Sequence, residues 1–548
     1  MMSITVVRIL NSGFVVTPSP DFVHLLRDYL KRMYRYEFRK TAKRVGGAIS
    51  FDSQRELKEK WCIELPNINE YRIHISYLTD FKVRFKDVKI DYLVSSLNPA
   101  DKVSFAMVSS FSPRGEQPDW IEFLSTHNGQ PHKALPATMG AGKTITFLAV
   151  LSEIGYRAYV MLPPFLSSRW LSEIEKFTDL DKKEYVYISG GTSLKSYMTT
   201  LEMGRNPFSI VLFSITTMRN YFRDYYINPE EFIYSPQEFF AKAGFGVRGI
   251  DEAHKELHFH FTSTLYANCS RYIALSGTLD KDNEYLCEMG ERLFPEDGRC
   301  PVGDVVASTD CVVYKMYYDT WTPKHMSSMG YSHVQYENQI RFNPTIRNAY
   351  FLYLAKIVYA EFVSKIVKDS DKCLVFMATV KLADMFDEFL RENAQVKDAF
   401  SSYNVGRLRA AEDDSKCDDL DIVITTVQRT GTGTDIPGLL TVFNTIPIAD
   451  SGLQRQVLGR GRPRDDINPR YIRLYSPTIR KHVQYNVESL RILNDLCTSV
   501  TMRELPGSMP NPTTWDKEQA KKTEGLERML RNSKAKGTKA RKASRRKR

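Results

Sequence analysis

The stretch Ala137-Thr-Met-Gly-Ala-Gly-Lys-Thr144 runs directly into the apolar segment Ile145-Thr-Phe-Leu-Ala-Val-Leu151. This pattern predicts a phosphate-binding loop that leads into a helix. Glycines at positions 140 and 142 let backbone amides close around phosphate oxygens that a Cβ would obstruct. Lys143 is expected to reach the β- and γ-phosphates of a nucleotide, and Thr144 to place its hydroxyl on Mg²⁺. The alternative is an ordinary glycine-rich turn before a helix, and the rest of the chain decides between them.

A pair of carboxylates follows about a hundred positions later, in Gly249-Ile-Asp-Glu-Ala-His254. Apolar strands that end in polar residues are where α/β sheets carry their chemistry. We expect Asp251 to bind Mg²⁺ opposite Thr144, and Glu252 to orient and deprotonate an attacking water. An isolated Asp-Glu pair also fits a surface turn. That interpretation is weakened by the phosphate loop upstream and by the Ala-His ending.

Three other segments add to this picture. Gln117 lies some twenty positions before the phosphate loop, and its amide is suited to contact the edges of an adenine. The predicted strands at residues 210–217 and 272–278 both end in small hydroxyl residues. Hydroxyls at the end of the first strand suit a phosphate backbone. Those at the end of the second are candidates to couple the carboxylate loop to nucleic acid.

A second α/β unit is predicted from a strand at 372–377, an amphipathic helix at 380–390 and a strand at 421–426. It continues into Gly431-Thr-Gly-Thr-Asp435 and Gln456-Val-Leu-Gly-Arg-Gly-Arg-Pro-Arg464. Arginines so far from the phosphate loop make sense if they reach across a cleft. Planar guanidinium groups would there stabilise charge on the γ-phosphate in the transition state. A basic helix end that contacts solvent or nucleic acid is the alternative.

The first 105 residues are less informative. Short strands surround an Asn-Ser-Gly turn, and residues 22–33 have helical spacing. Basic and aromatic residues mingle at 31–40 and again at 81–86. This mixture suits a nucleic-acid surface, with rings for bases and cations for phosphates. An amphipathic helix with a solvated charged face explains residues 31–40 equally well. Residues 280–345 show no periodicity and suggest a linker with an insertion.

Charge is concentrated at the end of the chain. Residues 533–548 hold nine Lys or Arg and no acid, so the remainder carries only +2 of the total net charge of +11. The tail is therefore predicted to be a disordered basic arm that contacts nucleic acid, with a solvated terminus or a localisation signal as alternatives. The sequence has no run of 18 apolar residues and no signal peptide, so no membrane contact is expected. The eight scattered cysteines indicate a reducing, cytoplasmic compartment and no metal cluster.

With these motifs in this order, the chain resembles superfamily 2 helicases of the DEAH type across residues 110–480. The resemblance implies an α/β fold with two tandem RecA-like domains, a small α+β N-terminal domain and the basic tail. It implies ATP and Mg²⁺ as cofactors. The nucleotide-binding residues would be Gln117, Thr138, Met139, Gly140, Ala141, Gly142, Lys143, Thr144, Asp435 and Gln456. The catalytic residues would be Lys143, Asp251, Glu252, Arg460, Arg462 and Arg464, with Thr144 and Asp251 on the metal.

Within this superfamily the chain is most similar to phage branch-migration helicases of the UvsW type, which share a Leu-Arg-Asp helix (residues 26–28 here) and a Ser-Gly third motif. The stretch 431–437 is also similar to the poxvirus transcript-release helicase. One position departs from the family pattern. Pro463 stands where the second arginine finger is usual, so Arg464 is favoured for that role and Arg462 is a close rival.

The expected function is an ATP-dependent DNA helicase that unwinds or remodels branched or duplex DNA in replication, recombination or repair. The host cytoplasm would be its location if it is viral, and replication or recombination proteins would be its partners. A double-strand translocase, an RNA-directed or transcript-release ATPase, and an ATP-gated nucleic-acid clamp remain open. The expected domains are 1–105 (accessory, nucleic-acid-binding), 106–330 (RecA-like, ATP-binding), 331–505 (second RecA-like) and 506–548 (extension with the basic tail).

Overall fold

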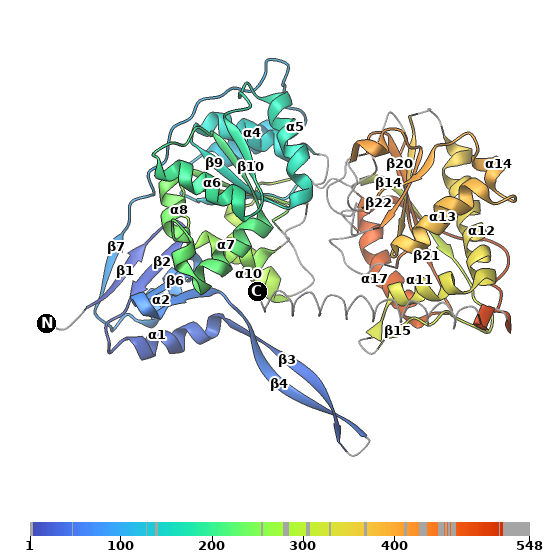
Figure 1. Ribbon diagram of the computed structural model, residues 1–548, viewed down its shortest axis with the longest axis horizontal. Coiled ribbons are helices and arrows are strands. Elements are labelled where there is room, and N and C mark those ends of the chain that lie inside the picture. Colours follow the sequence, from blue (N-terminus) through green and yellow to red (C-terminus); the bar gives the residue numbers. More distant parts are fainter. Residues whose placement is uncertain are drawn as a thin grey trace, which may run out of the picture. The chain divides into compact units, whose positions relative to one another are not determined.

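The computed structural model describes residues 4–518, apart from residues 46–47, 128, 138–140, 254–255, 278–283, 303–306, 328–329, 367–369, 410–413, 427–435, 448–453, 455–456, 459–460, 462–466 and 515. The chain divides into two compact units, Met1–Gly303 and Asp304–Arg548. Each unit is built around a parallel sheet with helices on its faces (Figure 1).

The first unit begins with a small sheet of order β5-β6-β2-β1-β7. Its strands are β1 (Thr5–Ile9), β2 (Gly13–Thr17), β5 (Cys62–Leu65), β6 (Glu70–His74) and β7 (Ile90–Val94), packed with helices α1 (Val23–Leu30) and α2 (Leu78–Arg84). The β1–β2 hairpin confirms the strands that surround the Asn-Ser-Gly turn. Phe81 and Phe85 of the second basic-aromatic stretch are buried in the core of this part. Their rings are therefore inaccessible to bases.

A long two-stranded ribbon projects from this part of the unit (Figure 1). It consists of β3 (Tyr34–Val45) and β4 (Ala48–Lys60), paired antiparallel from Tyr34↔Lys60 to Val45↔Ala48. The helical interpretation of residues 31–40 is therefore wrong beyond the short turn at Lys31–Met33. The aromatic residues at 34, 36 and 38 alternate with polar ones. That period of two is the signature of a strand.

The N-terminal part shares a core with the parallel sheet that follows it. Val7, Trp61 and Ile73 belong to the same buried cluster as Ile250 and Phe261. Asn11 adds hydrogen bonds to Asn268 and to the carbonyl of Cys269. Residues 1–105 thus pack as part of the first unit, so their helices and strands support the loops of the parallel sheet.

The parallel sheet of the first unit has the order β10-β11-β9-β12-β13-β8. Its strands are β8 (His132–Leu135), β9 (Ala158–Leu162), β10 (Tyr185–Ile188), β11 (Ile210–Ser214), β12 (Val247–Asp251) and β13 (Arg271–Leu275). Helices α3 (Gln117–Ser125), α4 (Lys143–Ile154) and α5 (Ser167–Phe177) share one core cluster with it. Helices α6 (Gly191–Glu202), α7 (Ile215–Ile227), α8 (Pro236–Lys242) and α9 (Leu257–Thr264) share another. Helix α10 (Glu284–Leu293) packs with the N-terminal part.

The second unit contains a seven-stranded parallel sheet of order β18-β19-β17-β20-β21-β14-β22. Its strands are β14 (Ala307–Lys315), β17 (Lys372–Met377), β18 (Val405–Arg407), β19 (Ile422–Thr426), β20 (Leu439–Asn444), β21 (Arg470–Tyr475) and β22 (Cys497–Glu504). Its helices include α11 (His333–Phe342), α12 (Pro344–Glu361), α13 (Val380–Glu392), α14 (Lys397–Phe400) and α17 (Arg480–Leu496), and β15 (Met326–Ser327) pairs with β16 (Gly330–Tyr331). The predicted α/β class with two tandem domains, each a parallel sheet flanked by helices, is confirmed.

Two expectations need correction. Residues 280–345 are no plain linker, because they contain α10, β14 and α11. Strand β14 pairs with β21 and β22 of the second sheet, so it belongs to the second unit although it precedes the expected boundary at residue 330. The basic tail lies outside the described residues. None of the helices in the described part of the chain combines the length and apolar character that crossing a bilayer requires.

Candidate active site

Residues 141–144 of the phosphate loop are described, and they lead into helix α4. Gly142 precedes the helix in the left-handed region, with φ +85°, a conformation that favours glycine. A Cβ at this position would also collide with the side-chain amide of Gln117. No described side chain caps the helix, so its first N–H groups point toward the loop. A helix end of this kind attracts an anion.

Lys143 and Thr144 are the first two residues of that helix. The Lys143 Nζ donates a hydrogen bond to the carbonyl of Ala137 across 2.9 Å, which joins the start of α4 to the first residue of the loop. Thr144 is buried, as a hydroxyl reserved for an interior ligand would be. The structure therefore places both side chains at the amino end of α4, and their roles toward phosphate and Mg²⁺ stay predictions. Thr138, Met139 and Gly140 lie outside the described residues.

Gln117 is the first residue of α3, and it contacts the phosphate loop directly. Its Nε2 donates to the carbonyl of Ala141 across 3.1 Å, and its Oε1 accepts from the backbone N–H of Arg114 at 2.9 Å. The nitrogen and the oxygen of the Gln117 amide are thus each hydrogen-bonded to a backbone group. Gln117 is brought to the predicted site, and in this structure its amide supports the loop.

The carboxylate of Asp251 stands at the end of β12 with both oxygens held. Oδ2 accepts from the indole N–H of Trp170 at 2.8 Å, and Oδ1 accepts from the backbone N–H of Glu252 at 2.8 Å. Burial raises the pKa of the Asp251 carboxyl, and the neighbouring Glu252 charge adds to the rise. The Trp170 hydrogen bond and the Lys143 ammonium oppose it. The phosphate-loop helix packs on the strand that ends in this carboxylate, because Phe147 of α4 lies against Gly249 of β12.

The loop after β12 is strained at both ends. Glu252 and Glu256 each have φ +52°, and they are two of the three described non-glycine residues with positive φ. Such conformations cost on the order of 1 kcal/mol or more each and concentrate at functional sites. The N–H of Ala253 donates to the carbonyl of Leu275 at 3.2 Å, which joins this loop to the end of β13. Glu256 forms an ion pair with Arg219 of α7 at 2.6 Å.

A second candidate surface lies at the carboxyl ends of β10 and β11. A cavity of about 700 Å³ lies there, and its lining includes Ser189, Gly190, Lys195 and Thr217 together with Asp224 and several apolar and aromatic side chains. The hydroxyl of Thr217 accepts from the N–H of Gly190 at 2.8 Å, which ties the two strand ends together. Small hydroxyls, backbone amides and one cation suit a phosphate backbone.

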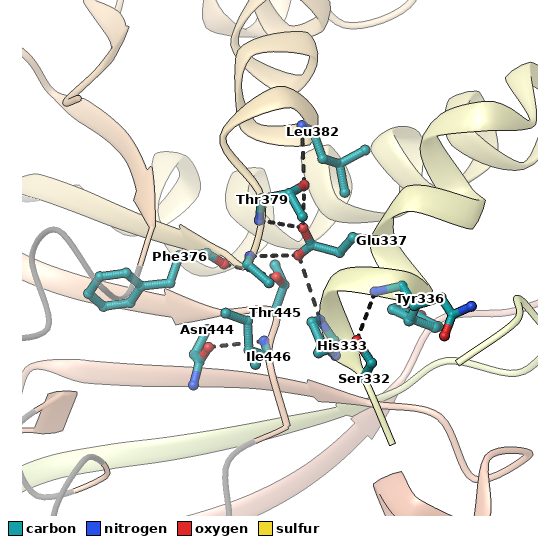
Figure 2. A network of polar contacts seen from close by, with 12 residues as sticks. Ser332, His333, Tyr336, Glu337, Phe376, Thr379, Leu382, Asn444, Thr445 and Ile446 are labelled. Carbon is teal, nitrogen blue, oxygen red and sulfur yellow. Dashed lines mark hydrogen bonds and ion pairs between the residues drawn. The ribbon is translucent and has the colours of Figure 1, made fainter. Parts of the chain in front are cut away.

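In the second unit, a carboxylate from helix α11 binds the backbone N–H groups that follow strand β17 (Figure 2). The fully buried Glu337 of α11 accepts hydrogen bonds from the N–H groups of Ala378 and Thr379 and from the Thr379 hydroxyl, each at 2.7 Å. Thr379 in turn caps α13 by accepting from the N–H of Leu382. His333 lies 3.6 Å from the same carboxylate. This helix end is therefore already occupied by an anion of the protein.

Several predicted residues lie outside the described part of the chain: Asp435, Gln456, Arg460, Arg462 and Arg464, with His254 and Thr278. Their roles stay predictions. Sequence reasoning missed Trp170 and Glu337, each of which lies far along the chain from the group it contacts. Trp170 lies on the buried face of α5, in the first turn of that helix.

No family model and no curated protein match the chain. Among solved structures it is similar to "DEAD-box helicase Mss116 bound to ssRNA and UDP-BeF", with 14% identity, a TM-score of 0.45, and coverage of 74% of this chain and 77% of that one. It is also similar to "Mss116p (NTE and C-tail double deletion) bound to ssRNA and AMP-PNP", with 15% identity, a TM-score of 0.44, and coverage of 72% and 74%. At this level of similarity, the assignment of function depends on the chain's own residues. The chain's own structure shows two α/β units built on parallel sheets, and in the first of them the carboxylates Asp251 and Glu252 follow β12, the strand on which α4 packs.

Proposed function

We propose that the chain is an ATP-driven nucleic-acid motor, and specifically a DNA helicase of superfamily 2 that unwinds or remodels branched or duplex DNA. One observation carries the proposal. The Phe147 ring of α4 lies against Gly249 of β12. The helix that begins at Lys143 is therefore packed on the strand that ends at the buried Asp251, so a candidate phosphate-binding group and a candidate metal-binding group lie on neighbouring elements. The hydroxyls and the lysine in the lining of the cavity at the ends of β10 and β11 support the nucleic-acid half of the proposal.

The residues of this site fit a Mg²⁺–nucleotide complex. Thr144 offers a buried hydroxyl, and each oxygen of Asp251 keeps a lone pair beyond the single hydrogen bond described for it. When bound, Mg²⁺ would neutralise charge on the β- and γ-phosphates. Lys143 and the uncapped N–H groups of α4 would bind those phosphates. Glu252 would orient a water and accept its proton. Arg460, with Arg464 or Arg462, would stabilise charge on the γ-phosphate.

Parallel ATPase assays with different nucleic acids test the proposal. Hydrolysis should be stimulated most by forked or four-way DNA, less by single strands and blunt duplex, and least by RNA. A fluorescence assay of strand separation on the forked substrate should report ATP-dependent unwinding. Stimulation by RNA alone would replace the DNA helicase with an RNA-directed motor. Stimulation by duplex without strand separation would indicate a translocase, and tight ATP-dependent binding with slow turnover would indicate a clamp.

A further inference from the structure

Trp170 makes a contact that the phosphate loop and the carboxylate pair do not explain. Its side chain is fully buried on α5, and its indole N–H donates to Oδ2 of Asp251 across 2.8 Å. Burial alone does not bring a tryptophan such a partner. Trp61 and Trp120 are also buried, and neither indole N–H has an acceptor among the described residues. A bond from an uncharged donor to a carboxylate is stronger than one to a carbonyl.

The position of the Trp170 ring is fixed by the phosphate-loop helix. The Phe147 ring of α4 meets it edge-on, with ring centroids 6.0 Å apart and an angle of 73° between the ring planes. Phe147 also packs tightly on β12, because a Cβ at Gly249 would lie 2.7 Å from its Cζ. The glycine at 249 therefore lets α4 approach the strand that carries Asp251. Phe147 and Trp170 form a continuous packed connection from Lys143 to the carboxylate.

We propose that Trp170 is a positioning residue that holds the carboxylate of Asp251 in the orientation required to bind Mg²⁺ at the phosphate loop. The proposal rests on the proposed nucleotide site. With Oδ2 held by the indole and Oδ1 by the Glu252 N–H, the carboxylate cannot rotate without breaking a hydrogen bond. Each oxygen keeps a second lone pair for the metal or its water. The indole thus supports a metal ligand in the way that outer-shell partners do in other metal sites.

The test measures how strongly Mg²⁺ enhances binding of a fluorescent ADP analogue. Wild-type protein should bind the analogue more tightly with Mg²⁺ than with EDTA. Trp170→Phe removes the N–H donor while keeping an aromatic ring, so the enhancement should fall about tenfold while affinity in EDTA stays the same. Trp61→Phe is the matched control, since it shortens a buried tryptophan with no acceptor for its N–H, and it should leave the enhancement unchanged. An unaltered enhancement in a folded Trp170→Phe protein would overturn the proposal.

A measurement on the unmutated chain covers the case in which Trp170→Phe fails to fold. The sequence contains five tryptophans, so a ¹⁵N-tryptophan spectrum should show five indole signals. The Trp170 signal should lie downfield of the Trp61 signal, because only the former is hydrogen-bonded to a carboxylate. It should move when Mg²⁺ is added to the ADP complex, and the Trp61 signal should not. If the chemical shift of the Trp170 indole does not change in a protein that binds Mg²⁺–ADP, the proposal is contradicted. Failure of the wild type to bind the nucleotide at all would instead refute the proposed function.

Discussion

The two units differ in which groups surround the amino end of a helix at the edge of the sheet. In the first unit, α4 starts after Gly142 with no described side-chain cap, and Lys143 reaches back across the loop. In the second unit, α13 starts after Thr379, and the buried Glu337 already accepts the N–H groups at that end. Both ends carry the positive pole of a helix. Among the described residues, the first end has no side-chain cap and the second has a buried carboxylate beside it, so the proposed phosphate site belongs to the first unit.

Removal of Lys143, the cation at the amino end of α4, should have the largest effect. Lys143→Ala should lower nucleic-acid-stimulated ATPase at least about a thousandfold, equivalent to about 4 kcal/mol, because it removes the cation that reaches across the loop. Steady-state hydrolysis measures the loss, and a binding assay should show nucleic-acid affinity largely retained. Lys183→Ala, at an exposed position of the same unit, is the control and should hydrolyse ATP normally. Unchanged turnover in Lys143→Ala would refute the site.

Removal of the Glu337 carboxylate tests the arrangement at the amino end of α13 in the second unit. Glu337→Ala would leave two backbone N–H groups and the Thr379 hydroxyl without their acceptor in a buried place, at a cost of about 3 kcal/mol. For a unit of this size, the unfolding midpoint should fall by about 6–12 °C in calorimetry. Glu388→Ala, at an exposed position of α13, should cost almost nothing. A Glu337→Ala protein as stable as the wild type would mean that the carboxylate does not close this end.

The histidines near Glu337 predict that the free energy of unfolding depends on pH. His482 is buried with its Nε2 2.6 Å from the Tyr331 hydroxyl. Burial, with smaller contributions from His333 and His325, lowers its pKa to about 2. The unfolded chain binds this proton near pH 6.5, so the stabilisation is complete above that pH and declines as the pH falls toward 2. Between pH 6.5 and 5 the loss should be about 2 kcal/mol.

Calorimetry of His482→Gln against wild type at several pH values isolates this contribution. The difference in unfolding midpoint between the two proteins should shrink as the pH falls below 6.5, because the variant has no proton to bind at this position. His24→Gln, at an exposed position of the first unit, should follow the wild-type curve throughout. Parallel curves for wild type and His482→Gln would show that the imidazole is not held neutral in the folded state.

Sequence reasoning predicted the parts of the site that are encoded locally. The chemistry of the phosphate loop and of Asp251–Glu252 depends on residues within a few positions of each other, so it could be recognised without a fold. The contacts that join distant segments could not. An inward-facing tryptophan is predictable from helical spacing, but its acceptor 81 positions away is set by how α5 crosses β12. Glu337 likewise resembles any helical glutamate until α11 packs beside the end of β17.

The fold errors have a similar origin. The β3–β4 ribbon was obscured by its charge, since a basic stretch fits a solvated helix face, although its alternating aromatics indicated a strand. Strand β14 was missed because it is inserted between two strands of the second sheet that come much later in the chain. A strand at such a position has no local partner. Its assignment therefore depends on the pairing of the whole sheet.

Deletion of the basic tail should have the smallest effect. It tests whether the tail binds nucleic acid through its charge alone. The prediction rests on the nine cations of residues 533–548. Removing them should weaken nucleic-acid binding about tenfold near 0.1 M salt and reduce the slope of log affinity against log salt by about two. Binding of the ADP analogue should keep its salt dependence, because the α4 site selects its anion by geometry. A full-length variant with the nine cations replaced by Gln controls for chain length and should match the deletion. An unaltered salt slope would show that the tail does not contact nucleic acid, and a fall in the maximal ATPase rate would show that it acts on the nucleotide unit instead.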